Sequence, residues 1–125
     1  MIEEAYVSFE TARLLKEKGF DELCFAYYYT YNDLEGKCLK LWRKFPRRPI
    51  NTDYLNVPTQ QMAMRWLREV YKIDISIYPY GNYSPDNYQF DVYENRYLIV
   101  SKDDGYMTYE EAIEAGIKYC LENLI

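Results

Sequence analysis

The sequence predicts an α+β fold: a mostly antiparallel sheet of about five strands with three helices, in the order α-ββ-α-βββ-α. Three observations lead to this prediction. Three segments begin with residues that cap helices, and the segments between them alternate apolar and polar residues as strands do. The strand segments also follow one another across short turn sequences, which favours antiparallel hairpins. With 125 residues, 49% of them apolar, we expect a single domain spanning residues 1–125.

Helix starts are marked by Ser8, Thr59 and Thr108, because serine and threonine commonly cap the N-termini of helices. The expected helices span residues 9–18, 60–72 and 109–123. Gly19 gives the first helix a C-terminal stop, and Glu111 completes a capping box with Thr108.

A glycine interrupts the apolar face of the last expected helix. That face consists of Ala112, Ile113, Ile117, Cys120, Leu121 and Leu124. Gly116 lies in the middle of it, although glycine lowers helix stability by about 1 kcal/mol relative to alanine. Such a glycine indicates a close crossing, so we expect this helix to pack tightly.

The strand signals lie between the helices. The expected strands span residues 23–31, 37–42, 73–78, 88–93 and 96–101. Ile73, Ile75 and Ile77 alternate with polar residues, which is typical of a half-buried strand. We expect turns at 32–36 and near 94–95, and an irregular segment at 45–57.

The absence of histidine excludes several kinds of site. Ser-His-Asp and Cys-His nucleophiles and His-ligated zinc or iron sites all require it. The three cysteines form no CxxC pair, and their odd number argues against a closed disulfide framework. We therefore expect no metal, no cofactor and no catalytic residues, and a cytoplasmic protein without a signal peptide or membrane span.

A run of basic residues is the strongest surface signal. Lys37, Lys40, Arg43, Lys44, Arg47 and Arg48 occur with no acidic residue between Glu35 and Asp53. The rest of the chain carries 9 basic and 20 acidic residues, a balance of −11, whereas the whole chain has a net charge of −5. Such a patch attracts phosphates or an acidic partner. The alternative is a solvated face that balances acidic helices.

Sixteen tyrosines are the second unusual feature. Tyr27, Tyr29 and Tyr31 share one face of the first expected strand, where they could stack on a ligand or contact a partner. Alternatively, tyrosines replace phenylalanine and leucine at the half-buried margins of a thin sheet. The candidate ligand-binding residues are Tyr27, Tyr29, Tyr31, Lys40, Trp42, Arg43, Lys44, Arg47, Arg48 and Tyr54.

Three segments carry a resemblance to other proteins. They are VSFETARLLKEKGF at 7–20, PTQQMAMRWLREV at 58–70 and YEEAIEAGIKYCLENLI at 109–125. They resemble a group of small uncharacterised proteins from gut Bacteroides genomes and their phages and prophages. The resemblance brings no activity, cofactor or site residues, and the stretch 27–55 departs from it. It implies an accessory role inside a bacterial host.

Three functions remain from different classes. The first is a non-enzymatic phage or prophage accessory protein that binds a host or phage protein and can form a homo-oligomer. The second is a small-ligand or nucleotide-sequestering protein, in which the 37–48 patch holds a phosphate and tyrosines stack on a base. The third is a histidine-free enzyme using tyrosine and arginine, for which the sequence contains no recognisable constellation.

Overall fold

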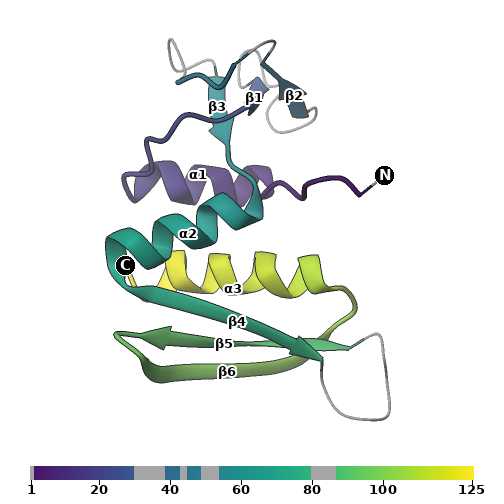
Figure 1. Ribbon diagram of the computed structural model, residues 1–125, viewed down its shortest axis with the longest axis vertical. Helices are drawn as coiled ribbons and strands as arrows, with labels where there is room; N and C mark the ends of the chain where they lie inside the picture. Colours follow the sequence, from purple (N-terminus) through teal and green to yellow (C-terminus); the bar gives the residue numbers. More distant parts are fainter. Residues whose placement is uncertain (1, 30–38, 43–44, 49–53, 80–86) are drawn as a thin grey trace. The chain divides into compact units, whose positions relative to one another are not determined.

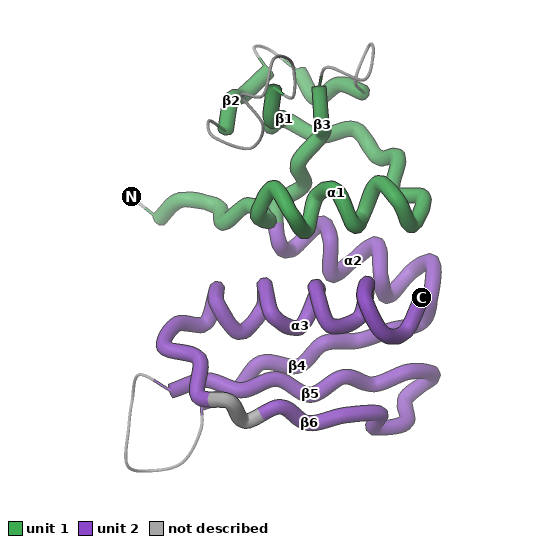
Figure 2. Tube along the Cα trace, turned by 180° about the vertical axis from the view of Figure 1, so that it is seen from behind, with its two compact units in different colours: residues 1–59 green, residues 60–125 purple. Residues whose placement is uncertain are grey.

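The computed structural model describes residues 2–29, 39–42, 45–48, 54–79 and 87–125 (Figure 1). The chain divides into two compact units, residues 1–59 and 60–125 (Figure 2). The described residues contain three helices and six strands, and every strand pair is antiparallel. The predicted α+β class and the three helices are therefore confirmed. The strands differ from the prediction in forming two three-stranded sheets instead of one sheet of about five. The single domain stays a prediction.

Unit 1 contains one helix and one sheet. Its elements are α1 (Phe9–Glu17), β1 (Ala26–Tyr29), β2 (Leu39–Leu41) and β3 (Tyr54–Val57), and the strand order is β2-β1-β3. Ser8 caps α1 by accepting a hydrogen bond from the amide of Thr11 at 3.2 Å. Gly19 follows the helix with a φ of +98°, a conformation that favours glycine. Both predicted ends of this helix are confirmed to within a residue.

The core of unit 1 lies between α1 and one face of its sheet. Leu15 of α1 is buried, as are Ala26 of β1 and Leu55 and Val57 of β3. The ring of Phe9 meets that of Tyr28 edge-on, with centroids 5.5 Å apart. Because side chains alternate along a strand, the intervening residues of β1 and β3 point to the opposite face.

Strand β3 is a difference from the sequence prediction. Residues 45–57 were expected to be irregular, but Tyr54–Val57 pairs with β1 along its whole length. Arg47, in the same expected segment, exchanges backbone hydrogen bonds with Cys24 at 3.0 and 3.1 Å. Short strands are stabilised by partners distant in sequence, so local composition predicts them poorly.

Unit 2 contains a meander covered by two helices. Its elements are α2 (Gln60–Tyr71), β4 (Ile73–Pro79), β5 (Tyr88–Glu94), β6 (Tyr97–Tyr106) and α3 (Tyr109–Asn123). The strand order is β4-β5-β6, and Figure 1 shows α3 running over the sheet. The buried residues of the sheet include Ile73, Phe90 and Val92. The buried residues of α3 include Ile113, Ile117 and Leu121.

Gly116 lies where the sequence predicted a close crossing. A Cβ atom at this position would lie 3.0 Å from Cγ2 of Ile75 and 3.4 Å from the ring of Phe90. The helix therefore approaches the sheet so closely that a side chain at this position would require its neighbours to shift, which confirms the predicted tight packing.

The expected capping box of α3 is present with one change. The Thr108 hydroxyl accepts a hydrogen bond from the Glu111 amide at 3.0 Å. The Glu111 carboxylate accepts one from the Met107 amide at 3.2 Å, one residue before the usual position.

A two-residue turn joins β5 to β6. Asn95 and Arg96 both have positive φ, 51° and 71°. This is the φ pattern of a type I′ turn, whose second central position usually holds glycine. Strand β6 continues to Tyr106, five residues beyond its predicted end.

Candidate functional site

Seven of the ten predicted site residues lie in the described part of unit 1. Tyr31, Arg43 and Lys44 lie outside it, as does Lys37. Tyr27 and Tyr29 belong to β1, and Tyr54 on β3 is the direct cross-strand partner of Tyr29. Trp42 follows β2 and bonds through its amide to the carbonyl of Phe25 at 2.7 Å. We call Tyr27, Tyr29, Trp42 and Tyr54 the aromatic face; strand alternation places its tyrosines opposite the residues that pack on α1.

The four rings of the aromatic face contact one another. Tyr27 and Trp42 stack with centroids 4.1 Å apart and planes 26° from parallel. Tyr54 meets Tyr27 edge-on at 5.4 Å and lies 5.7 Å from Trp42 and 5.4 Å from Tyr29. Such pairs contribute about 0.5–1.5 kcal/mol beyond area burial. All four residues are half-buried, so the cluster is assembled but still reaches the surface.

Arg47 extends this cluster instead of presenting a free charge. Its guanidinium carbon lies 5.3 Å from the ring centroid of Trp42 and 5.0 Å from that of Phe45. Its Nε is buried and has no hydrogen-bond partner among the described residues. Guanidinium is planar and weakly hydrated, which allows it to stack on aromatic rings. Arg47 thus adds a flat cationic contact to the aromatic face.

The two other described cations of the expected phosphate patch, Arg48 and Lys40, differ in their contacts. Arg48 donates from Nε to the carbonyl of Asp21 at 3.2 Å and lies 3.5 Å from its carboxylate. Both side chains are exposed, so this pair adds little stability. Lys40, on β2, is exposed beside its cross-strand partner Tyr27. The basic run is therefore partly committed to contacts inside unit 1.

Asn56, the cross-strand partner of Tyr27, lies on the same face of the sheet as the rings and was missed by sequence reasoning. It is only 8% exposed, and its Oδ1 accepts a hydrogen bond from Nε1 of Trp42 at 3.5 Å. Its Nδ2 donates to the backbone carbonyl of Arg47 at 2.5 Å. The available signal was an asparagine between Leu55 and Val57, since asparagine is depleted in strands unless its amide has partners.

One large apolar side chain is exposed beside the aromatic face. Phe45, which contacts Arg47, is 54% exposed and extends the apolar part of that face. Leu41, the last residue of β2, is 61% exposed, but it pairs with Ala26 and so lies on the opposite face of the sheet.

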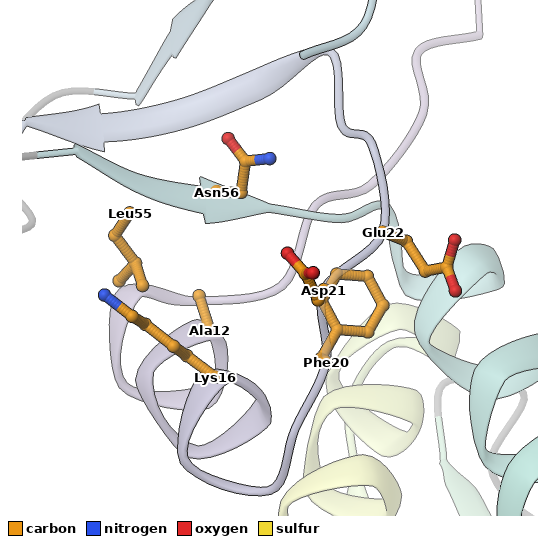
Figure 3. Close-up of a pocket in the computed structure, with 7 residues that line it drawn as sticks. All are labelled: Ala12, Lys16, Phe20, Asp21, Glu22, Leu55 and Asn56. Atoms are coloured by element: carbon orange, nitrogen blue, oxygen red, sulfur yellow. The ribbon is translucent and has the colours of Figure 1, made fainter. Parts of the chain in front are cut away.

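A small hollow lies between α1 and β3 in the same unit (Figure 3). Its volume is about 60 Å³, and Ala12, Lys16, Phe20, Asp21, Glu22, Leu55 and Asn56 line it. The charged side chains are exposed at its rim, and Asp21 already contacts Arg48. Ligand pockets usually measure roughly 300–1,000 Å³, so this hollow is too small for an organic ligand.

The described cysteines are poorly suited to nucleophilic chemistry, which requires a thiolate. Burial raises the pKa of Cys24 to about 12, with a further contribution from nearby Glu22. Burial likewise raises the pKa of Cys120 to about 12, so both thiols stay neutral near pH 7. Both are buried free thiols, and Cys38 lies outside the described residues.

The described residues contain no cluster of three or more cysteine, aspartate or glutamate side chains placed to hold a metal ion. In the same part of the chain, no helix combines the length and apolar character that crossing a membrane requires.

The fold and surface define an α+β protein with an assembled aromatic face. Comparisons of the chain with protein-family models, curated proteins and solved structures gave no match.

Proposed function

We propose that this protein acts by binding another protein through the aromatic face and Arg47, without catalysis. The observation that carries the proposal is the assembly itself. Four rings and a guanidinium are held together on the side of the β2-β1-β3 sheet opposite the α1-packed side chains. An ordered cluster loses little conformational entropy when a partner binds, which favours affinity.

The composition of the surface supports a protein partner. Tyrosine, tryptophan and arginine are the residues most enriched at the centres of protein–protein interfaces. Exposed Phe45 extends the apolar contact, and Lys40 adds an exposed charge. We propose a partner surface with an apolar centre and acidic groups at its margin.

The biological setting is part of the same proposal. The segments at 7–20, 58–70 and 109–125 resemble proteins of Bacteroides genomes and their phages. This resemblance supports an accessory role in the cytoplasm of the bacterial host, with a host or phage protein as partner. A second copy of the chain is an alternative partner.

The alternative of nucleotide binding has less support at this site. A base would stack on an open ring face, but Tyr27 and Trp42 already cover one face of each other at 4.1 Å. Arg47 likewise lies over Trp42 instead of extending into solvent. Lys40 is the described cation that favours this alternative, because it is exposed beside Tyr27.

The test compares partner recovery between matched variants. Immobilised protein is incubated with Bacteroides lysate, and the bound proteins are quantified by mass spectrometry. Tyr54→Ala and Arg47→Lys should each reduce recovery of a specific partner at least about tenfold, whereas Tyr97→Ala should not. Tyr97 is a matched control because it is 76% exposed and lies in unit 2. Arg47→Lys keeps the charge and removes the planar group.

Two outcomes would overturn the proposal. Equal recovery by the wild type and both aromatic-face variants would exclude this surface as the interface. A nucleotide-induced rise in melting temperature that is sensitive to salt and lost in Arg47→Ala would favour nucleotide binding instead. Native mass spectrometry of the same samples identifies a second copy as the partner.

A further inference from the structure

A groove of about 300 Å³ lies within unit 2, between α3 and the strands beneath it. Lys118, Tyr119 and Glu122 line it from α3, where Glu122 is three and four residues after the other two. Phe90 contributes from β5, and Lys102 and Tyr106 contribute from β6. None of these residues belongs to the aromatic face of unit 1.

Three rings form the apolar part of the groove. Phe90 is 1% exposed and lies at the base. The ring of Tyr106 lies 5.8 Å from it, tilted by 31°, and the ring of Tyr119 lies 6.3 Å from it, tilted by 53°. Both tyrosines are half-buried, so the groove has an aromatic base and tyrosine walls. Such a lining accepts a planar apolar group.

Lys102 adds a charge at an unusual position. Its direct partner on β5 is Phe90, so it lies on the face of the sheet that α3 covers. It is half-buried, and its Nζ lies 5.5 Å from the ring centroid of Tyr119. An ammonium over a tyrosine ring is attracted by the ring's electrons while it remains available to an anion.

Lys118 brings a second ammonium to the same groove. Its Nζ lies 3.8 Å from the Glu122 carboxylate, a partly exposed pair one helical turn apart. Two lysines and one glutamate give the lining a positive balance. Unit 2 as a whole holds six basic and eleven acidic residues, a balance of −5, whereas unit 1 holds nine of each. Two of the six basic residues of an acidic unit thus converge on this groove.

We infer that the groove binds a small organic anion that carries an aromatic ring. The ring lies against Tyr106 and Tyr119, which cover the buried ring of Phe90, and a phosphate or carboxylate group is held by Lys102 and Lys118. The volume is at the lower end for ligand pockets, which fits a one-ring molecule. This inference is independent of the proposed protein interface, since it uses other residues in the other unit.

The probe is phenyl phosphate, which combines one ring with one phosphate. Its binding is followed by chemical-shift changes in two-dimensional NMR spectra of the full chain. Inorganic phosphate and phenol, each of which corresponds to one half of the probe, are titrated separately for comparison. We expect phenyl phosphate to bind at least about tenfold more tightly than either half, with shifts centred on Phe90 and Tyr119. Benzoate in place of phenyl phosphate distinguishes a carboxylate from a phosphate ligand.

Matched double variants test the two lysines. Lys102→Gln with Lys118→Gln should weaken phenyl phosphate binding at least about tenfold. Arg65→Gln with Arg68→Gln removes the same charge from α2 and should change binding less than twofold. The spectra themselves report whether each variant is folded. Equal loss in both double variants, unchanged binding in the lysine variant, or equal binding of all three probes would overturn the inference.

Discussion

Asn56 accepts a hydrogen bond from the indole Nε1 of Trp42 at 3.5 Å, in a strand where its neighbours Leu55 and Val57 are buried apolar residues. The same side chain donates to the carbonyl of Arg47. One buried amide therefore connects the indole ring to the backbone of the residue that stacks on it. The position of the aromatic face depends on this polar residue as well as on ring contacts.

Replacing Asn56 by alanine should lower the free energy of unfolding by about 1–3 kcal/mol, because the Trp42 indole loses an acceptor and the Arg47 carbonyl keeps only the Cys24 amide as a donor. The measurement is urea denaturation followed by tryptophan fluorescence. A Trp66→Phe background leaves Trp42 as the reporter, since the chain contains two tryptophans. Asn123→Ala, at an exposed position, should change stability by less than about 0.5 kcal/mol. Equal effects of the two substitutions would contradict the role of Asn56.

Gly116→Ala tests the crossing of α3 over the sheet. Alanine would gain about 1 kcal/mol in helix propensity, but its Cβ would press on Ile75 at 3.0 Å and on Phe90. Overpacking of this kind typically costs about 1–3 kcal/mol, so we expect a net loss of stability in chemical denaturation. In an Ile75→Ala background the same substitution should become stabilising. A stabilising effect in the wild-type background would show that the contact is not tight.

Thr108→Ala tests the cap of α3. The substitution removes the acceptor for the Glu111 amide, and we expect unfolding to become easier by about 1 kcal/mol. Thr108→Ser keeps the hydroxyl and should recover most of this loss. Thermal melts followed by circular dichroism compare the three proteins. If serine and alanine behave alike, the hydroxyl makes no contribution.

The two buried thiols predict a stability that declines at high pH. The pKa of each thiol is about 12 in the folded chain, whereas its ordinary value is 9.0. As the pH rises, the unfolded chain therefore loses these protons before the folded chain does. Stability from each thiol is complete below pH 9 and falls by about 1.4 kcal/mol per pH unit as pH rises towards 12. Denaturation at pH 8.5 and 10.5, in a Cys38→Ser background, measures the slope. Cys24→Ala with Cys120→Ala should flatten it, and an unchanged slope would assign the decline to other groups.

Local chemistry predicted much of the fold. Ser8 and Thr108 fixed two helix starts because a cap is a short-range hydrogen bond within one turn. The alternation of Ile73, Ile75 and Ile77 predicted β4 because strand burial has a period of two. Gly116 predicted the close crossing because glycine weakens a helix, and a missing side chain in an apolar helix face leaves room for a neighbouring element.

The remaining features depend on contacts between distant segments. Tyr54–Val57 becomes a strand because β1 supplies its hydrogen bonds, and no local pattern encodes that partner. The charge of Arg47 suggested phosphate binding, whereas the fold places its guanidinium against the rings of Trp42 and Phe45. Nothing in the local sequence marks Lys102 as a candidate ligand-binding residue. That role follows from its position opposite Phe90 in the sheet. Side-chain charge is visible in a sequence, but the environment of that charge is not.

The β5–β6 turn offers a position for a stabilising substitution. Arg96 holds a φ of 71° that a non-glycine residue adopts at a penalty of roughly 1–2 kcal/mol. Arg96→Gly would release that strain at a site outside both the aromatic face and the groove lining. A variant of unit 2 that folds poorly can therefore be rescued in an Arg96→Gly background, which separates loss of binding from loss of structure.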